Sequence, residues 1–306
     1  MSKLTVSTSP HIHSKRTTTS VMLDVIIALI PAIIASVVIF GIRSLILIAA
    51  SIITAVVSES LFNLICKKKN TVGDLSAVVT GILLALNVPA TLPVWQLCFG
   101  SLFATVAVKA LFGGIGQNFA NPAATARVMM ILSFGGAMTE YYYPTTDTVA
   151  SATPLALISG GAAHKVPSTL ELLLGLHGGC LGETCAFALI LGGIYLLARK
   201  VITWHAPVAF IGTVFVCSYF LGLPPVAEIL TGGLMLGAIF MVTDYSTTPI
   251  TKSGRLIFGI GCGLITILIR KWGSYPEGVS FSILFMNILT PYIEKWTYRR
   301  PLGGAK

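Results

Sequence analysis

Residues 21–41 read VMLDVIIALIPAIIASVVIFG, an almost uninterrupted apolar run of the length that crosses a bilayer as a helix. Similar apolar runs recur along the chain as far as Ile293. The whole sequence is 55% hydrophobic and 10% charged, with a mean hydropathy of +0.87, which is far from the composition of a soluble domain. The sequence therefore predicts an all-α integral membrane protein whose helices are largely solvated by lipid.

The apolar runs and the breaks between them predict about ten transmembrane helices. With the first helix starting inside, 16 of the 20 Lys and Arg residues fall on the cytoplasmic side, as the positive-inside rule requires. Arg43, Lys165, Arg270 and Lys271 are the exceptions. The predicted helices lie at 21–41, 44–65, 75–89, 93–112, 121–138, 180–198, 206–222, 226–243, 255–270 and 278–293.

This topology divides the chain into five parts. Residues 1–20 are polar and basic, without the apolar core of a signal peptide, and form a cytoplasmic amino-terminal segment. Residues 21–138 and 180–293 each hold about five helices, and residues 139–179 form an external loop between them. Residues 294–306 are a cytoplasmic tail, so both termini are expected in the cytoplasm.

The two groups of helices resemble each other in sequence. TGILLALNVP from Thr80 is similar to TGGLMLGAIF from Thr231, and the Lys109–Phe119 region is similar to the Arg270–Phe281 region with several residues skipped. Because each repeat holds an odd number of helices, the second must be inverted relative to the first. Inverted repeats commonly place a binding site at mid-membrane between the halves. Chance similarity between apolar sequences is the alternative explanation.

The external loop contains TDTVASATPLALISGG, in which Asp147 lies six residues before Thr153. Ser151 and Ala152 come directly before Thr153, and small residues let a segment lie extended in another enzyme's active site. A threonine hydroxyl is a poor nucleophile, so it needs such an enzyme to become a phosphoester. Pro154 disfavours helix at the residue before it. On composition alone, an ordinary Ser/Thr-rich loop is the competing interpretation.

A second segment with possible chemistry is FGGIGQNFANPAATARVMM, from Phe112. Its glycines allow close backbone approach, and Asn118 and Asn121 offer amide donors and acceptors. Pro122 is expected to begin the next helix and Asn121 to cap it. Contact with a flavin or a quinone is one interpretation of this pattern. A re-entrant turn that serves packing alone is the other.

Three acidic residues are candidates for an ion path. Asp24 and Glu59 lie inside predicted spans, where a charge without a partner is costly. Asp244 begins a run of oxygen-bearing side chains in TDYSTTPITKSGR, and such hard ligands suit a small cation. Helix capping by Asp244, and pairing of Glu59 at the interface, remain open alternatives.

Several classes of function are disfavoured. The net charge of +9 could indicate nucleic-acid binding, but the cations are scattered between apolar segments, so no nucleic-acid partner is expected. The six cysteines lack CxxC spacing and the five histidines lack metal-ligand spacing. The cysteines are expected to be small core residues, and no metal site is predicted.

The spacing from Asp147 to Thr153 resembles the acceptor motif of the periplasmic flavin transferase, which joins FMN through its phosphate to the final threonine. The segment from Phe112 and the long segment MLGAIFMVTDYSTTPITKSGRLIFGIGCGLITILIRKWGSYPEGVSFSILFMNILTP from Met235 resemble the same family. That family comprises the D subunit of the Rnf ion-translocating ferredoxin:NAD oxidoreductase and the B subunit of the sodium-translocating NADH:quinone oxidoreductase. The chain lacks the long amino-terminal extension of the latter, so it is more similar to the Rnf D subunit.

The resemblance implies a flavoprotein subunit of a six-subunit complex in the bacterial cytoplasmic (inner) membrane. FMN would be linked covalently to Thr153, within an attachment motif that includes Asp147, Ser151 and Ala152 and faces outside. A second, non-covalent flavin such as riboflavin would lie between the helices. The partners would be Rnf subunits A, B, C, E and G, with the flavin transferase acting during maturation.

Two functions from different classes follow. In the first, the chain relays electrons between ferredoxin and NAD(H) within a complex that moves Na⁺ or H⁺, and it is not catalytically complete alone. In the second, it is a secondary transporter with a substrate site between inverted repeats. The Asp147–Thr153 segment discriminates between them, because a solute carrier has no reason to possess it.

Overall fold

The computed structural model describes residues 16–68, 71–143, 148–150, 153–160, 167–273 and 277–298. The first half contains α1 (Thr18–Phe40), α2 (Ile42–Ile65), the 3₁₀ turn η1 (Val72–Asp74), α3 (Ser76–Leu86), α4 (Val94–Leu102), the π-helix η2 (Phe103–Ala110), α5 (Pro122–Ser133) and α6 (Gly135–Met138). The connecting stretch contains β1 (Tyr141–Tyr143), β2 (Thr148–Ala150), α7 (Pro154–Ser159) and α8 (Thr169–Leu174). The second half contains α9 (Ala186–Ala198), α10 (His205–Phe220), α11 (Pro225–Leu230), α12 (Leu234–Leu236), the π-helix η4 (Gly237–Met241), α13 (Lys252–Trp272) and α14 (Val279–Thr297).

Helices occupy part of each predicted range, but two predictions of a single helix are wrong. Over 121–138, α5 ends at Ser133 and the separate helix α6 begins at Gly135. The other is the range 226–243. That range is broken between α11 and α12, where Gly232 and Gly233 have φ of 67° and 68°. The Arg270 guanidinium lies beside the break and donates to the carbonyl oxygens of Glu228 at 2.6 Å and Thr231 at 3.1 Å. Side-chain hydrogen bonds therefore replace those that a continuous helix would make.

The expectation of purely α structure is also incorrect in detail, because β1 and β2 form an antiparallel hairpin in the stretch between the two halves. Tyr141 pairs with Ala150 and Tyr143 pairs with Thr148 in this hairpin. The chain is otherwise mostly helical, and β2 ends three residues before Thr153. The hairpin is therefore the nearest described element before Thr153 in the sequence.

Within the described residues, α1, α2 and α13 are the helices that are long and apolar enough to cross a membrane. Shorter apolar helices include α3, α9, α10 and the continuous α4–η2 segment. Large apolar side chains such as Val38, Ile42 and Ile65 are exposed at 78%, 68% and 78%. An outer surface of this kind suits hydrocarbon and not water.

Small residues allow helices to approach closely in both halves. Gly259 and Gly263 lie one turn apart on α13, against α10, and a Cβ at Gly263 would lie 2.6 Å from the Thr213 Cβ. Gly192 places α9 against α1, where a Cβ would collide with the carbonyl oxygen of Ala28. Close packing of small residues is typical of helix contacts in membranes, where no hydrophobic driving force operates between helices.

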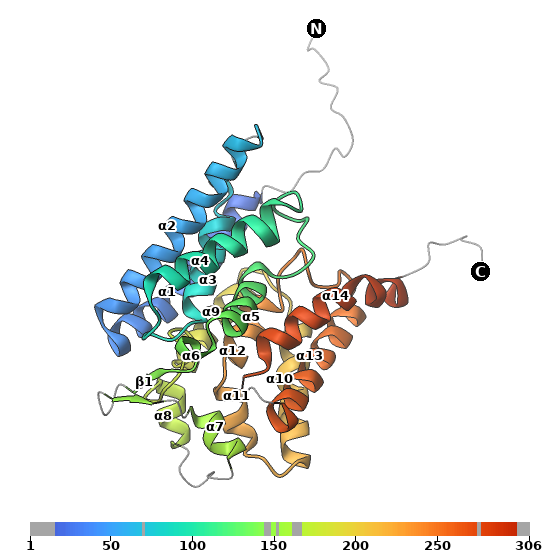
Figure 1. Cartoon of the computed structure of the whole chain (residues 1–306). Helices are drawn as coiled ribbons and strands as arrows, with labels where there is room; N and C mark the ends of the chain where they lie inside the picture. The colour runs from blue at the N-terminus through green and yellow to red at the C-terminus, as the bar shows by residue number, and fades with distance from the viewer. Residues whose placement is uncertain are drawn as a thin grey trace, which may run out of the picture.

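The two halves occupy different regions of the molecule (Figure 1). Helices α1 to α4 lie together at the upper left of the view, whereas α10, α13 and α14 lie at the lower right. Helices α5, α9 and α12 lie between these groups. Strand β1 and helices α7 and α8 gather at the lower end of the view, away from the carboxyl end of α2.

The contact between α1 and α9 can be tested at Gly192. We expect Gly192→Ala to destabilise the fold by about 1–3 kcal/mol, because the added methyl group overlaps the backbone of α1. The matched control is Gly212→Ala on α10, where nothing lies within 4 Å of a Cβ and where alanine favours helix by up to about 1 kcal/mol. Thermal unfolding in detergent should show a lower Tm for Gly192→Ala only; equal Tm values would contradict the proposed close approach.

Candidate functional site

The glycine-rich segment predicted from sequence leads directly into α5. Glycines at 113, 114 and 116 have φ of 122°, 97° and 82°, backbone conformations that other residues rarely adopt. The Asn121 side chain accepts a hydrogen bond from the Ala124 N–H at 3.1 Å, and Pro122 is the first residue of α5. The predicted cap and helix start are thus confirmed.

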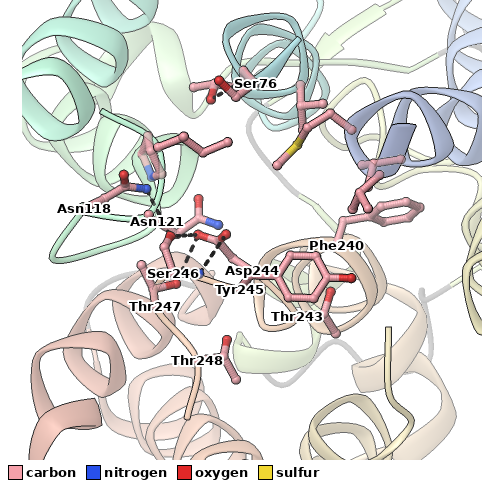
Figure 2. Close-up of a pocket in the computed structure, with 18 of the residues that line it drawn as sticks. Ser76, Asn118, Asn121, Phe240, Thr243, Asp244, Tyr245, Ser246, Thr247 and Thr248 are labelled. Atoms are coloured by element: carbon pink, nitrogen blue, oxygen red, sulfur yellow. Dashed lines mark hydrogen bonds between the residues drawn. The ribbon is translucent and has the colours of Figure 1, made fainter. Parts of the chain in front are cut away.

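The segment after η4 lies beside this glycine-rich turn. The Asn118 amide donates to the Ser246 hydroxyl at 3.2 Å, and the Asn121 amide donates to the Met241 carbonyl at 3.4 Å. Figure 2 shows Asn118 and Asn121 next to Ser246 and Asp244, with a dashed line for the hydrogen bond from Asn118 to Ser246. Two segments more than 100 residues apart in the chain therefore form one site.

Asp244 makes its hydrogen bonds within its own loop. Its carboxylate accepts from the hydroxyls of Ser246 at 3.1 Å and Thr247 at 3.2 Å. The residue lies just beyond the predicted span 226–243, and burial raises the pKa of its carboxyl group although these hydrogen bonds oppose the shift. Thr251, and not Asp244, caps the following helix α13, so the capping alternative for Asp244 is wrong. Its carboxylate instead holds a turn in the loop after η4 and lines the cavity described next.

A cavity of about 810 Å³ opens between the two halves at this place. The size lies within the range of pockets that hold drug-sized ligands or cofactors. Its walls are largely apolar, from side chains such as Val21, Leu83 and Phe240, and asparagines supply polar groups. Among the described residues, Asn118 Oδ1 and both polar atoms of the Asn287 amide are buried without hydrogen-bond partners. These atoms are available to a bound ring that carries donors and acceptors.

Glu59 is paired with a cation that is distant in sequence. Lys109 Nζ lies 3.0 Å from the Glu59 carboxylate and 2.5 Å from the Ser76 hydroxyl, and Thr71 also donates to Glu59 at 2.8 Å. Both charged side chains are 3% exposed. Glu59 is therefore paired with Lys109 in the protein interior, where both side chains are buried. Lys109 and Ser76 line the cavity.

Asp24 lies at the end of a more exposed pair. Its carboxylate accepts from the Tyr195 hydroxyl at 3.0 Å and from Arg199 at 3.3 Å. The Arg199 side chain is 56% exposed, so the pair reaches the protein surface. The structure does not bring Asp24 into contact with Glu59 or Asp244.

Thr153 lies at the amino terminus of α7, next to the hairpin. Its backbone is extended, with φ of −72° and ψ of 163°, and its hydroxyl accepts a hydrogen bond from the Ala156 N–H at 3.2 Å. The residue is 3% exposed. The predicted motif residues Asp147, Ser151 and Ala152 lie outside the described residues.

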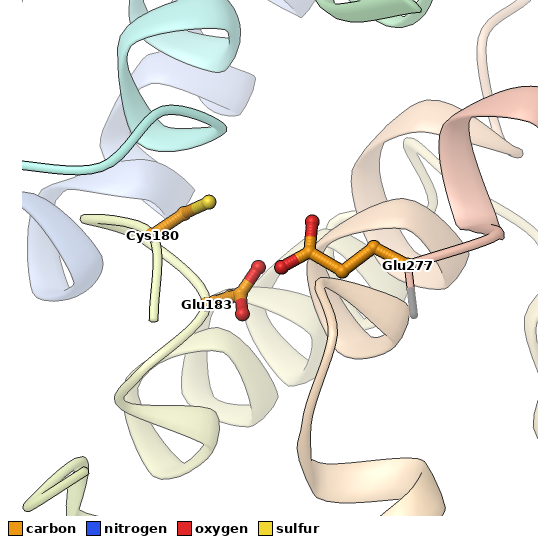
Figure 3. A group of neighbouring side chains, drawn as sticks. All are labelled: Cys180, Glu183 and Glu277. Atoms are coloured by element: carbon orange, nitrogen blue, oxygen red, sulfur yellow. The ribbon is translucent and has the colours of Figure 1, made fainter. Parts of the chain in front are cut away.

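Sequence inspection missed a buried ionic cluster around Arg127. This residue was assigned to the cytoplasmic side, but its guanidinium is 2% exposed and contacts Glu277, with Glu183 at 3.8 Å. Cys180, Glu183 and Glu277 point toward one another (Figure 3). The available signal was the presence of Arg127 and Glu183 inside the apolar ranges 121–138 and 180–198.

Arg270 and Glu228 form a third buried pair, with an Nη1–Oε2 distance of 2.7 Å. Together with Lys109 and Arg127, Arg270 was counted in the positive-inside test, but a buried and paired cation carries no information about orientation. Without these three residues, 14 of the remaining 17 Lys and Arg residues fall on the side predicted to be cytoplasmic.

Comparison with known proteins places this architecture in a family. The sequence profile of the NQR2, RnfD, RnfE family matches residues 5–303. The chain belongs to this family. Its apolar helices and this membership make it an integral membrane protein.

Curated members of the NQR2, RnfD, RnfE family match almost end to end. The chain is 48% identical to the D subunit of the Na(+)-translocating ferredoxin:NAD(+) oxidoreductase complex of Acetobacterium woodii, covering 99% of this chain and 96% of the relative. It is 39% identical to the D subunit of the proton-translocating ferredoxin:NAD(+) oxidoreductase complex of Clostridium ljungdahlii, covering 99% and 97%. It is 34% identical to the D subunit of the ion-translocating oxidoreductase complex of Cronobacter sakazakii, covering 97% and 98%. The predicted similarity to the Rnf D subunit is confirmed.

The Glu59–Lys109 pair can be tested by removing one or both charges. We expect Lys109→Met to destabilise the protein by about 3–5 kcal/mol, because it leaves the Glu59 carboxylate buried without its cation. The double variant Glu59→Gln/Lys109→Met leaves no buried charge and should recover most of the loss. Unfolding in detergent measures both, and a double variant as unstable as the single one would contradict the pairing.

Proposed function

We propose that the chain is a membrane subunit of an ion-translocating ferredoxin:NAD oxidoreductase complex, in which it carries flavin and relays electrons between ferredoxin and NAD(H). The similarity to D subunits over nearly the whole chain carries this proposal. The subunit would act in the cytoplasmic membrane with subunits A, B, C, E and G, and would not complete a reaction alone. The names of its relatives include both Na⁺ and proton translocation, so the proposal covers either ion.

The alternative, a secondary transporter, receives less support. A cavity between two halves would suit a solute site as well as a cofactor. The relatives, however, are all named as subunits of oxidoreductase complexes. We therefore keep the redox proposal and use flavin content to decide between the two.

The topology that we propose has ten spanning helices in two inverted repeats, with both termini cytoplasmic and the hairpin outside. The buried pairs support it, because Lys109 and Arg270 stand at the same place in the two similar sequence segments. Each ends the fourth helix of its half, at η2 and α13, and each is held by a buried glutamate.

The Thr153 hydroxyl is the proposed attachment point for FMN, within the motif that includes Asp147, Ser151 and Ala152. The extended backbone before Pro154 fits such a link, whereas the buried hydroxyl does not present itself to an enzyme. The flavin transferase could therefore act only where Thr153 is released from its hydrogen bond with Ala156. Bound FMN would supply the electron-transfer chemistry, and the protein would hold it in place.

Attachment can be tested by in-gel flavin fluorescence after denaturation, with the flavin transferase co-expressed. We expect wild type to fluoresce and Thr153→Ala to be dark, because the ester oxygen has been removed. Ser159→Ala is the matched control, since Ser159 is an exposed hydroxyl on the same helix and its loss should change nothing. A dark wild type, or equal fluorescence in Thr153→Ala, would refute covalent flavin at this residue.

A second flavin, bound without a covalent link, is proposed for the cavity between the halves. Riboflavin has a flat ring with amide and carbonyl groups, which suits an apolar cavity with asparagine side chains at its wall. The unpartnered atoms of Asn118 and Asn287 are the observation that favours a polar ring there. Asn118 and Asn121, the two asparagines singled out from the sequence, both line this cavity, which supports the proposal.

Non-covalent flavin is measured as flavin released on denaturation, in the Thr153→Ala background. We expect about one released flavin per chain, and loss of most of it in Thr153→Ala/Asn287→Leu, because the leucine removes an amide that the ring would satisfy. Stability should be unchanged, since Asn287 has no hydrogen bond to lose among the described residues. Equal flavin in both variants would exclude Asn287 from the site.

Glu59 and Asp244 remain the proposed carboxylates of the ion path, because Asp244 and the cation that pairs with Glu59 line the cavity. Asp24 is kept as a further candidate, buried itself but paired with the exposed Arg199. The role of Glu59 can be tested by measuring ion-coupled turnover of the intact complex that carries the double variant Glu59→Gln/Lys109→Met. We expect weaker coupling; undiminished coupling would exclude Glu59 from the ion path.

A further inference from the structure

The cluster around Arg127 joins five titratable side chains from four parts of the chain. These are Arg127 on α5, Tyr141 on β1, Cys180 and Glu183 before α9, and Glu277 before α14. All five are buried. Arg127 donates to the Asn87 side-chain oxygen at 2.9 Å and to the Cys180 sulfur at 3.3 Å, and it contacts the Glu277 carboxylate.

The charges of this cluster do not balance if both carboxylates are ionised. In the described residues, Glu59 faces one cation and Glu228 faces one cation, so those two buried pairs are neutral. Glu183 and Glu277 share Arg127 alone. The cysteine thiol and the tyrosine hydroxyl are neutral in their protonated forms, which leaves one negative charge in excess. An excess charge in a buried site of a membrane protein is strongly unfavourable.

The geometry shows which carboxylate is short of partners. Glu277 accepts from the Tyr141 hydroxyl at 3.0 Å and also contacts Arg127. Glu183 Oε2 is buried and has no hydrogen-bond partner among the described residues, and Arg127 Nη2 is 3.8 Å away. Glu183 nevertheless points toward Glu277 and Cys180 (Figure 3). One carboxylate oxygen of each glutamate and the Cys180 Sγ atom all lie within 4.8 Å of one another. The oxygen without a hydrogen-bond partner thus belongs to a cluster that lacks one positive charge.

We propose that Glu183 and Glu277 form a proton-binding site, in which the two carboxylates hold one exchangeable proton beside Arg127. One proton neutralises the cluster and, when shared between the two carboxylates, gives Glu183 Oε2 a hydrogen-bond partner. A divalent metal ion fits less well, because Arg127 already occupies the space beside Glu277 and would be repelled by it. Na⁺ fits less well because it needs several oxygen ligands, and the Cys180 thiol and the Asn87 oxygen bound to Arg127 do not supply them.

The site is connected to the stretch that contains Thr153. Tyr141 belongs to β1, which pairs with β2 just before that residue, and its hydroxyl donates to Glu277. Protonation of the carboxylate pair therefore changes the acceptor that holds the hairpin. A role in redox-linked ion movement rests on the proposed function, whereas proton binding itself does not.

The test is infrared spectroscopy of the full chain in lipid nanodiscs as the pH is varied. The Thr153→Ala chain is used, so that the result is independent of covalent flavin. We expect the C=O band of a protonated carboxyl group to persist at neutral pH and to disappear on alkalinisation. Glu183→Gln should remove the band without loss of stability, because it leaves a balanced Arg127–Glu277 pair, whereas the exposed Glu140→Gln should leave the band unchanged.

A second variant tests the connection to the hairpin. Tyr141→Phe removes a donor that favours the ionised carboxylate, so the midpoint of the band's titration should move to higher pH by roughly one unit. The proposal is overturned if the band is absent, if Glu183→Gln removes no part of it, or if NaCl in place of choline chloride abolishes the part that depends on Glu183 at constant pH. An unchanged midpoint in Tyr141→Phe would overturn the connection.

Discussion

The structure depends on one constraint: a charge or backbone polar group in hydrocarbon must find its partner inside the protein. Lys109 and Arg270 meet this requirement by pairing with Glu59 and Glu228, each within the same half of the chain. Arg270 does more, since its hydrogen bonds to carbonyl oxygens permit the break between α11 and α12. A buried cation thus stabilises the irregular backbone between α11 and α12.

Irregular backbone of this kind is found where the two halves meet. The glycine-rich turn before α5 and the loop after η4 have few regular hydrogen bonds of their own, and they satisfy each other through Asn118 and Ser246. The remaining space is a cavity with apolar walls and unpartnered amides. Both proposed cofactor positions therefore follow from helix interruption, one in the cavity and one in the stretch that joins the halves.

The sequence was sufficient for features that depend on neighbouring residues. Apolar runs placed the helices, and the Asn–Pro pair at 121–122 identified a cap and a helix start, because both are local effects. The two motifs from Phe112 and Met235 were recognised, but their contact needed the fold. Ion-pair partners were unpredictable for the same reason: Glu59 and Lys109 are 50 residues apart, and Arg127 and Glu277 are 150 apart. Likewise, no local pattern distinguished the buried hydroxyl of Thr153 from an exposed one.

The hydrogen bond from Tyr141 to Glu277 also has a consequence for biosynthesis. The donor is made before α9 to α14, whereas the acceptor is among the last residues of the second half to leave the ribosome. The hairpin is therefore without this anchor while most of the second half is being inserted into the membrane. Maturation steps that require an accessible Thr153 have their opportunity in that interval, before the final helix completes the fold.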